Sequence, residues 1–372
     1  MSIGKWQVSV VLPTYNESEN MPVIIPKICS VLEGAGIRGE VIVVDDNSPD
    51  GTAVAARKLA ETLPVRVVVR TEDRGLATAV IAGFNLSGAQ VCVVMDADGS
   101  HPVEKLPEMI RPILEGRADI TVGSRHVTEG GIGQWPLHRR IVSKAAALMT
   151  LGLTKMSDPT SGFMAIRRTF LQGLELNPVG WKIVLEIVVK AKTARLMEVP
   201  FTFNDRELGE SKMSFREQWN YIKHLCRLYR YRMPTLSEFI RFCIVGFSGL
   251  FVDMGVVIGV KTLFALDTRL CAVFGFMAAM STNYLLHRNW SFEGARGTPV
   301  VRSYLTFVAV CCVGLAGRLG VMHMLIEYAG LDGGYRYILT NFIGILAGTL
   351  VNYAGSRFFA FSPDRLAFGK KE

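Results

Sequence analysis

Two aspartates, Asp96 and Asp98, follow the apolar run 91–95 in the segment Asp-Ala-Asp-Gly-Ser-His-Pro at 96–102. Carboxylates at positions i and i+2 of a tight turn can face one hard cation, because Mg²⁺ and Mn²⁺ prefer oxygen ligands. The preceding run is typical of a buried strand, and open α/β sheets bind ligands beyond the carboxyl ends of their strands. The pattern therefore predicts a site for a metal and a phosphorylated ligand. Aspartates also cap turns without binding anything, so the pair alone leaves both interpretations open.

Two earlier polar turns also follow apolar runs, with Pro-Thr-Tyr-Asn-Glu at 13–17 and Asp-Asp-Asn at 45–47. Strands alternate with helices along this part of the chain, which predicts an α/β fold with a doubly wound sheet and right-handed crossovers. The three turns would then share one edge of the sheet. The predicted strands are 8–12, 40–44, 65–70 and 91–95, and the predicted helices are one that ends at 32, capped by Asn16 or Ser18, and those at 52–63 and 75–87.

The 372 residues carry a formal net charge of +8, and 49% of them are hydrophobic. This length predicts two domains, and long apolar stretches are concentrated in residues 239–361. A basic chain suits phosphorylated substrates or an anionic membrane surface. The basic residues cluster near the predicted phosphate and membrane segments, which argues against a nucleic acid as partner. The seven cysteines show no metal-ligand spacing and are expected to pack as small hydrophobic side chains.

Four apolar segments in the second half are each long enough to cross about 30 Å of hydrocarbon. Basic residues dominate the loop between the second and third segments and the C-terminal tail, which predicts cytoplasmic termini by the positive-inside rule. The N-terminus lacks the apolar run of a signal peptide. We therefore expect a multi-pass protein of the cytoplasmic membrane, with domain 1–233 on the cytoplasmic face and domain 234–372 in the bilayer. The apolar segments are 239–263, 270–286, 304–326 and 337–359.

The membrane half contains an internal repeat, which predicts two helical hairpins of the same orientation. Asp253 aligns with Arg318 in this repeat, and both fall near mid-span, where a lone charge is expensive. We therefore expect these two side chains to pair between the hairpins. The repeated residues are Asn283, Tyr284, Arg288 and Phe292, which recur as Asn352, Tyr353, Arg357 and Phe361, and Phe239, Phe242, Val245 and Gly249, which match Tyr304, Phe307, Val310 and Gly314.

Two segments before the membrane half, 137–153 and 214–232, combine basic with apolar residues. The second has an apolar and a basic stripe at helical spacing, which is typical of a helix that lies on an anionic membrane surface. The alternative is a helix packed on the core of the first domain. The apolar stripe consists of Phe215, Trp219, Ile222, Cys226 and Tyr229, and the basic stripe of Arg216, Lys223, Arg227 and Arg230.

The motifs of residues 8–232 together resemble the family 2 glycosyltransferases of GT-A fold, and more closely the polyprenol-phosphate (dolichyl-phosphate) mannose synthases. The second half resembles the GtrA-like membrane domain that is fused to some of these synthases. The resemblance implies a GT-A (Rossmann-like) domain followed by four transmembrane helices. Besides the three turns, it rests on Gly-Ser-Arg at 123–125, Gly-Gly at 130–131 with Trp135, Arg-Arg at 139–140 with Ser143, Ser-Asp-Pro-Thr-Ser-Gly-Phe at 157–163, Val-Pro at 199–200 and Asp-Arg-Glu-Leu-Gly-Glu-Ser-Lys at 205–212.

The resemblance implies a role for each matching residue. Asp96, Asp98 and Ser100 would hold Mg²⁺ or Mn²⁺, with Ser100 where some synthases have a glutamine. Asp98, Arg125 and Arg206 would be the catalytic residues. The nucleotide and diphosphate of the donor would contact Pro13, Tyr15, Glu17, Asp45, Asp46, Asp96, Ala97, Asp98, Arg206 and Lys212, and the acceptor phosphate would contact Arg125, Arg139, Arg140 and Ser143.

The implied reaction is the inverting transfer of mannose from GDP-mannose to a polyprenyl (dolichyl) phosphate. A lipid phosphate is already anionic, so guanidinium groups that position it matter more than a strong base. One alternative has the same chemistry with UDP-glucose or another UDP-sugar as donor. Another is a lipid-sugar flippase whose transferase domain has degenerated, against which the intact Asp96, Asp98, Arg125 and Arg206 argue.

Two further titratable residues have ambiguous positions. His101 is expected to pack beside the metal turn and not to bind the metal. Glu186 lies on a helix predicted over 182–192, where it could face the cleft, although a structural role is favoured.

Overall fold

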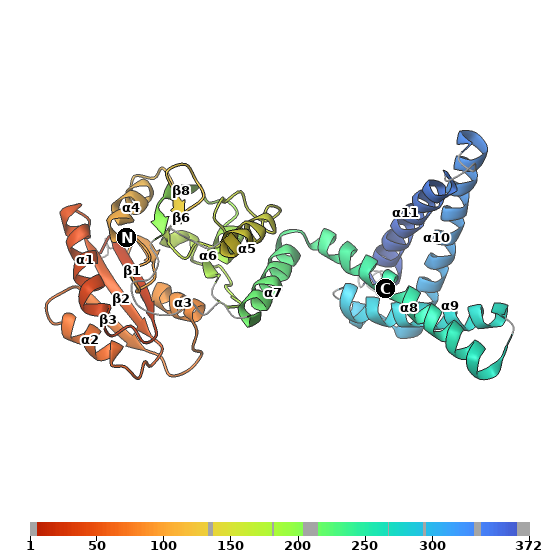
Figure 1. Ribbon diagram of the computed structural model, residues 1–372, viewed down its shortest axis with the longest axis horizontal. Coiled ribbons are helices and arrows are strands. Elements are labelled where there is room, and N and C mark those ends of the chain that lie inside the picture. The colour runs from red at the N-terminus through yellow and green to blue at the C-terminus, as the bar shows by residue number, and fades with distance from the viewer. Residues whose placement is uncertain are drawn as a thin grey trace, which may run out of the picture. The chain divides into compact units, whose positions relative to one another are not determined.

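The computed structural model describes residues 6–132, 137–180, 182–203, 215–266, 268–292, 295–330 and 336–362. The chain divides into two units, Met1–Arg232 and Met233–Glu372 (Figure 1). The first contains all the strands of the described residues, and the second consists of helices.

A seven-stranded sheet with the order β3-β2-β1-β4-β7-β5-β8 forms the centre of the first unit. Its first four strands are parallel, which confirms the predicted α/β arrangement. β7 lies antiparallel between β4 and β5, so the sheet is mixed, and the sequence did not predict this strand. A small parallel pair joins β6 to β9. The strands are β1 Val8–Thr14, β2 Gly39–Asp45, β3 Val65–Val69, β4 Val91–Val94, β5 Ile120–Ser124, β6 Gly131–Ile132, β7 Met164–Arg167, β8 Leu196–Pro200 and β9 Thr202–Phe203.

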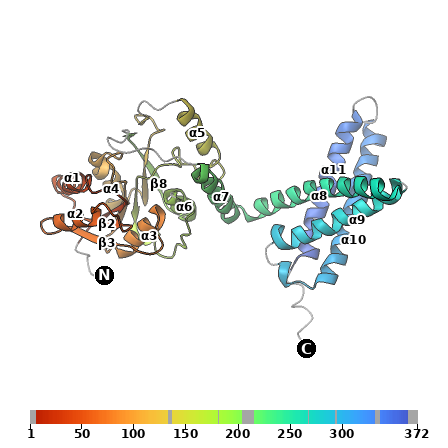
Figure 2. The ribbon, with the colours of Figure 1, turned by 60° about the horizontal axis from the view of Figure 1, so that its bottom comes forward.

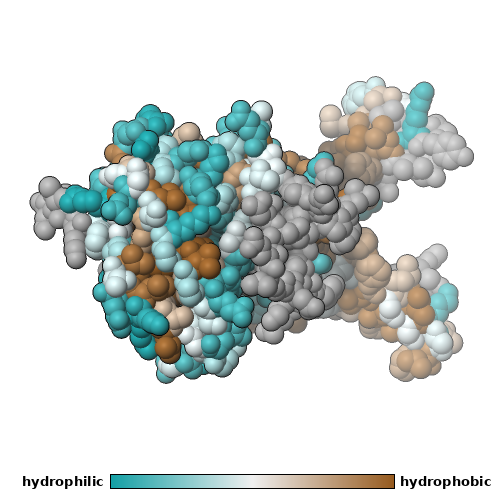
Figure 3. Space-filling view, turned by 60° about the vertical axis from the view of Figure 1, so that its left-hand side comes forward, coloured by the Kyte–Doolittle hydropathy of each residue, from teal (hydrophilic) through white to brown (hydrophobic). Residues whose placement is uncertain are grey.

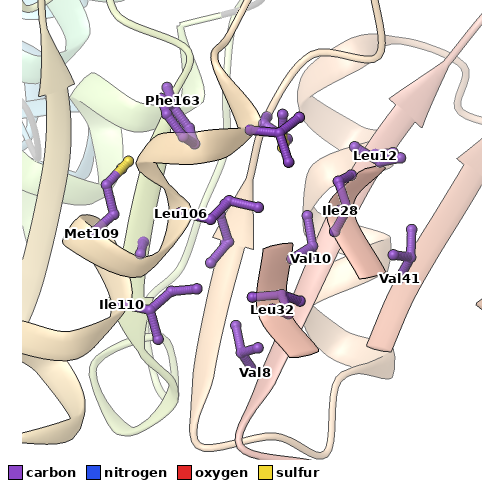
Figure 4. Close-up of a cluster of buried hydrophobic side chains, with 14 of the residues drawn as sticks. Val8, Val10, Leu12, Ile28, Leu32, Val41, Leu106, Met109, Ile110 and Phe163 are labelled. Atoms are coloured by element: carbon purple, nitrogen blue, oxygen red, sulfur yellow. The ribbon is translucent and has the colours of Figure 1, made fainter. Parts of the chain in front are cut away.

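Helices cover both faces of this sheet (Figure 2). Along β1 the side chains alternate between two cores, since Val8, Val10 and Leu12 enter the first and Val11 the second. The first core includes side chains of α1 and α4 (Figure 4) and of α2, and the second includes side chains of α3, α6 and α7. The helices are α1 Met21–Gly34, α2 Thr52–Leu59, α3 Leu76–Leu86, α4 Leu106–Leu114, α5 Leu137–Leu148, α6 Ile183–Lys190 and α7 Phe215–Arg232, with single 3₁₀ turns at Val103–Lys105 and Arg168–Phe170.

The predicted cap of α1 is wrong. The helix begins at Met21 after Asn20, and no side chain caps it. A proline fills one of its first two positions, and the Met21 N–H donates to the Glu17 carbonyl. Asn16 has a positive φ of 61°. Its backbone N–H donates to the Ser48 hydroxyl, which ties the first polar turn to the second.

Two helical hairpins form the second unit, α8 with α9 and α10 with α11 (Figures 1 and 2). Among the described residues, α8 and α10 are long and apolar enough to cross a membrane. Hydrophobic residues cover much of the surface of these helices (Figure 3). The elements are α8 Pro234–Phe264, α9 Thr268–Leu286, the π-helical turn η3 His287–Ser291, the 3₁₀ turn η4 Ala295–Gly297, α10 Val300–Ala329, α11 Arg336–Gly355 and the π-helical turn η5 Ser356–Ala360.

The sequence repeat in this unit is matched by a repeat of contacts. The Tyr284 hydroxyl donates to the carbonyl of Val300, the first residue of α10, at 3.0 Å. The equivalent Tyr353 hydroxyl donates to the carbonyl of Thr235, near the start of α8, at 3.2 Å. The second helix of each hairpin therefore holds the beginning of the other hairpin.

The predicted pair between Asp253 and Arg318 is not formed among the described residues. A Cβ built on Gly275 of α9 would lie 2.5 Å from Oδ1 of Asp253, and one built on Gly344 of α11 would lie 3.3 Å from Cγ of Arg318. Each charged side chain therefore packs over a glycine of its own hairpin. The pairing within hairpins explains why alignment of the two positions in sequence does not bring them together.

Candidate active site

The carboxyl edge of the sheet brings the predicted acidic turns together. Asp45 pairs with Thr14 at the ends of β2 and β1, and Met164, the first residue of β7, pairs with both Val94 and Val122. Because β7 runs antiparallel, the segment before it lies at the same edge as the turns that follow β4 and β5. The turns that follow β1, β2, β4 and β5 and the segment before β7 therefore border one region.

The Asp96–Asp98 turn follows β4 and is held by its own backbone. The Asp96 N–H donates to Nδ1 of His101 at 3.0 Å, and the Ser100 N–H donates to Oδ1 of Asp98 at 3.0 Å. Gly99 has a φ of +76°, a conformation that favours glycine. The Asp96 side chain is 32% exposed, whereas Ala97 is buried. The turn thus presents a carboxylate to the solvent side of the edge.

His101 packs against this turn. Its buried ring stacks on Phe163 with centroids 5.1 Å apart, and Nε2 lies 3.9 Å from Oδ2 of Asp96. Burial lowers the pKa of His101, while the neighbouring Asp96 and Asp98 act in the opposite direction. Since Nδ1 accepts a hydrogen bond, the neutral ring carries its proton on Nε2. The imidazole therefore orients Asp96, in agreement with its predicted packing role.

Gly123 in β5 makes room for the aromatic group behind the turn. A Cβ at this position would lie 2.9 Å from Phe163 and 3.1 Å from Phe201. These two rings are in edge contact with each other, and Phe201 is also in edge contact with His101. The glycine of the Gly-Ser-Arg motif is therefore required by packing.

The donor atoms at this turn fit a hard divalent cation. Ser100 is 1% exposed, and its hydroxyl has no hydrogen-bond partner among the described residues. A buried hydroxyl without a partner is uncommon and points to a ligand or water oxygen nearby. No group of three His, Cys, Asp or Glu side chains suited to a metal occurs in the described part of the chain. Two carboxylates with one hydroxyl are the donor set that the turn offers, and such oxygen ligands suit Mg²⁺ or Mn²⁺.

Asp45 and Asp46 are buried and serve the architecture of the edge. Asp45 accepts hydrogen bonds from the Thr14 hydroxyl at 3.1 Å and from the Ser48 backbone and hydroxyl at 2.9 and 2.5 Å. Asp46 accepts from Arg70 Nε at 2.8 Å and from the Gly75 N–H at 2.7 Å, and also pairs with Arg70 Nη2. All four carboxylate oxygens of this turn are thus engaged within the protein.

The remaining predicted donor residues of the first turn differ in exposure. Pro13 is buried in β1, and Tyr15 is 54% exposed. The Glu17 N–H donates to the Thr52 hydroxyl at 2.9 Å, and its carboxylate accepts from Asn20 at 2.6 Å. The turn thus offers an exposed aromatic ring beside a fixed carboxylate.

Arg125 is buried and held by an acid. Its Nε and Nη2 donate to the two oxygens of Asp158 at 2.6 and 2.7 Å, and Nη2 also donates to the Thr160 hydroxyl at 2.7 Å. Burial opposes ionisation of Asp158, but the hydrogen bonds from Arg125 outweigh it and lower the pKa of this carboxyl. Arg125 and Asp158 therefore form a buried pair that links β5 to the segment before β7.

The other predicted phosphate-binding residues are only partly described. Ser143 is buried on α5, and its hydroxyl lies 3.4 Å from Nε2 of His126. Arg139 and Arg140 are on the same helix, but their side chains lie outside the description. Arg206 and Lys212 also lie outside the described residues.

Sequence reasoning gave no role to Asp158, Thr160 or Lys182, which lie beside Arg125. Asp158 and Thr160 belong to the motif at 157–163, which was a signal for the family but not for an ion pair. Nothing in the local pattern around Lys182 singled it out. Its Nζ donates to the Thr160 carbonyl at 2.8 Å.

Glu186 is fully buried on α6 and braces α7. Its Oε1 accepts from the Asn177 N–H at 2.9 Å and from Lys190 at 2.6 Å. Its Oε2 lies 3.7 Å from Nη2 of Arg227 on α7. These contacts favour the structural role that the sequence suggested.

α7 has features of both predicted roles, a helix on a membrane surface and a helix packed on the core of the first domain. Leu225 and Leu228 are buried in the second core, and the Tyr221 hydroxyl donates to the Ala146 carbonyl at 3.0 Å. Trp219 and Ile222 remain 52% and 42% exposed. One face of the helix therefore packs on the domain while another presents apolar side chains. On and after α5, the exposed apolar residues are Ile141, Val142, Leu148, Met149 and Leu151.

Comparison with known families assigns both units. Residues 9–174 match the family described as Glycosyl transferase family 2, and residues 241–361 match the GtrA/DPMS transmembrane domain. These matches and the mixed sheet confirm the predicted fold class, and the transmembrane domain makes the chain a membrane protein.

Curated relatives extend the similarity. A dolichol-phosphate mannosyltransferase of Pyrococcus furiosus is 35% identical over 94% of this chain and 98% of its own length. A polyprenol monophosphomannose synthase of Mycolicibacterium smegmatis is 40% identical over 55% of this chain and 80% of its own. Among solved structures, a mannosyl-3-phosphoglycerate synthase of Rubrobacter xylanophilus aligns with 62% of this chain and 77% of its own, at 20% identity and a TM-score of 0.48.

Proposed function

We propose that this chain, which belongs to the dolichol-phosphate mannosyltransferase family of membrane glycosyltransferases, transfers mannose from GDP-mannose to a polyprenyl (dolichyl) phosphate. The observation that carries the proposal is the similarity to the Pyrococcus furiosus mannosyltransferase, because it extends over both units of the chain. The acidic edge beside a buried cluster of cationic groups supports a reaction between two phosphorylated substrates.

The donor nucleotide is proposed to lie along the turns that follow β1 and β2. The exposed Tyr15 ring can stack on a base, and Asp45 and Asp46 fix the backbone around it. Ala97 is buried in the turn that would face the diphosphate. The proposed donor contacts are Pro13, Tyr15, Glu17, Asp96, Ala97, Asp98, Arg206 and Lys212, and Asp45 and Asp46 are proposed to hold the backbone beside the nucleotide.

A divalent cation fits the oxygen set of Asp96, Asp98 and Ser100. When bound, Mg²⁺ or Mn²⁺ would supply positive charge that stabilises the diphosphate as it leaves. His101 orients Asp96 for this task through its two ring nitrogens. The protein's contribution is thus a turn that is rigid before the ligand arrives.

The acceptor phosphate is proposed to attack the anomeric carbon of mannose directly, forming the new C–O bond as the bond to GDP breaks. One displacement inverts the configuration and yields a β-linked product. Since the acceptor is already anionic, no strong general base is required. Asp98 and Arg206 are the proposed catalytic residues, and Arg125 is proposed to position the segment 157–163 beside them. The acceptor phosphate is proposed to lie near Arg125, Arg139, Arg140 and Ser143.

The second unit is proposed to span the cytoplasmic membrane several times as four helices, with the boundary near residue 233. The two long apolar helices support this topology. The catalytic unit would lie on the cytoplasmic face, where nucleotide sugars are made. Exposed apolar residues on α5 and α7, such as Leu148 and Trp219, suit contact with the lipid acceptor's surroundings.

A transfer assay tests the proposal. Membranes that contain the full chain are incubated with radiolabelled GDP-mannose or UDP-glucose, Mg²⁺ and a polyprenyl phosphate. We expect label in the lipid fraction from GDP-mannose, and none from the same membranes carrying D98N. Label that enters lipid only from the UDP-sugar would overturn the mannose assignment, and unchanged transfer by D98N would overturn the site.

A further inference from the structure

We propose that Lys182 binds a phosphate oxygen of one of the two substrates, and that Arg125 positions the segment against which Lys182 packs. The proposal rests on the proposed function and changes which cation meets the phosphate. Sequence resemblance implied Arg125 for this task, and no role was assigned to Lys182.

The group around Lys182 lies at the edge that carries the Asp96–Asp98 turn. Arg125 directly follows β5, and Thr160 belongs to the segment that leads into β7. In that segment, a Cβ built on Gly162 would lie 3.7 Å from Oδ2 of Asp96. Lys182 is the residue directly before α6, and its Nζ reaches the Thr160 carbonyl. The four elements therefore converge next to the proposed diphosphate site.

The charge of Arg125 is already balanced within this group. Asp158 is fully buried, and it accepts hydrogen bonds from the Arg125 backbone N–H, Nε and Nη2 at 3.1, 2.6 and 2.7 Å. A buried bidentate pair of this kind contributes little net charge to its surroundings, and breaking it is costly. Arg125 is therefore suited to hold the segment 157–163 in place.

Lys182 contributes a cationic group to this part of the edge. Its 2.8 Å hydrogen bond ends on the Thr160 carbonyl, which is a neutral acceptor, and the Thr160 hydroxyl accepts from Arg125 and donates to Asp158. The partial burial of Lys182 and the nearby Arg125 lower its pKa to about 8, while Asp158 and Asp96 favour the charged form. The ammonium thus brings one positive charge to the edge, and lysine binds phosphate as a point charge.

Variants of the full chain separate the charge of Lys182 from its hydrogen bond. K182M removes both, K182Q keeps a neutral donor for the Thr160 carbonyl, and K182R keeps the charge. K58M is the matched control, since it removes a lysine charge from an exposed position on α2. We expect K182M and K182Q to lower kcat/KM for one substrate on the order of 100-fold through its KM, and K182R to recover about tenfold of that loss.

The substrate whose KM rises identifies the phosphate. A rise for polyprenyl phosphate indicates the acceptor monophosphate, and a rise for GDP-mannose indicates the donor diphosphate. K182Q with wild-type KM values for both substrates would overturn the proposal, because a neutral donor would then suffice. Wild-type membranes that transfer no mannose would instead refute the proposed function.

Chemical labelling of the wild-type protein keeps the proposal testable if the variants do not fold. Acetic anhydride labels lysine side chains, and mass spectrometry measures the extent at each. We expect GDP with Mg²⁺, or polyprenyl phosphate, to protect Lys182 and leave Lys58 unchanged. Equal labelling of Lys182 with and without both ligands would overturn the proposal.

Discussion

The acidic turns after β2 and β4 lie at one edge of one sheet and each carries two carboxylates, yet their surroundings differ. Asp45 and Asp46 are buried, and all four of their oxygens accept hydrogen bonds from the protein. Asp96 is 32% exposed, and the hydroxyl of nearby Ser100 has no partner among the described residues. A turn whose carboxylate oxygens are all filled by the protein shapes the edge. A turn with an exposed carboxylate beside a buried hydroxyl that lacks a partner in the described structure can bind a ligand.

The largest effect is expected from D98N in the second of these turns. Loss of one proposed metal ligand should reduce transfer by about 1,000-fold, equivalent to about 4 kcal/mol of transition-state stabilisation. The melting temperature should stay close to that of the wild type, because this carboxylate does not hold the sheet together. Initial rates and thermal unfolding of the same preparation check both parts. A melting temperature of D98N well below that of the wild type would contradict this prediction, because the second turn would then stabilise the fold as the first does.

D46N in the first turn should chiefly destabilise the protein. The change leaves the partly buried Arg70 facing a neutral amide, at a cost of about 3 kcal/mol. In a unit of this size, the melting temperature should fall by roughly 6–12 °C. E115Q is the control, since its partner Arg117 is exposed and such pairs contribute about 0–1 kcal/mol. A melting temperature of D46N equal to that of the wild type would show that the Asp45–Asp46 turn does not stabilise this edge of the sheet.

G123A tests the packing that supports the open turn. A methyl group 2.9 Å from Phe163 must displace the rings behind His101, which should cost about 2 kcal/mol. G34A is the matched control, because no atom lies within 4 Å of a Cβ there. Chemical denaturation of both variants measures the difference. Equal free energies of unfolding for G123A and G34A would contradict the prediction, because the rings behind His101 would then accommodate the added methyl group without cost.

The smallest effect concerns Asp119, an acid used entirely for structure. Hydrogen bonds from Arg195 outweigh burial and hold its pKa well below the ordinary value. A depressed carboxyl pKa stabilises the folded state above the unfolded value of about 4, and this contribution is lost as pH falls toward the folded pKa. D119N should therefore cost about 1 kcal/mol at neutral pH and flatten the fall in stability below about pH 4. Unfolding curves across this range check the slope, and an unchanged slope would contradict the assignment.

Sequence patterns predicted what depends on local periodicity. The parallel strands and the three polar turns follow from apolar runs that end in acidic residues, and the repeated Tyr284 and Tyr353 lie in equivalent contacts. The antiparallel β7 was missed because four residues carry no distinctive pattern.

Side-chain partners distant in the chain were beyond local reasoning. Arg125 was predicted to contact the acceptor phosphate, and only the folded chain shows that Asp158, 33 residues later, accepts hydrogen bonds from its guanidinium. Lys182 joins the site only because α6 begins beside the Thr160 carbonyl. Asp253 and Arg318 aligned in the repeat but pack within separate hairpins. In each case the role of a side chain depends on the residue it contacts, and that residue is distant in the sequence.

Mn²⁺ binding tests the central claim most directly. The signal of free Mn²⁺ in electron paramagnetic resonance falls as the ion is bound, and GDP is added to complete the site. Wild-type protein should remove Mn²⁺ from solution in a GDP-dependent manner, and E115Q should do the same. D98N should leave the free-ion signal unchanged while it remains folded. GDP-dependent uptake by folded D98N equal to that of the wild type would contradict the claim that this turn binds the cation.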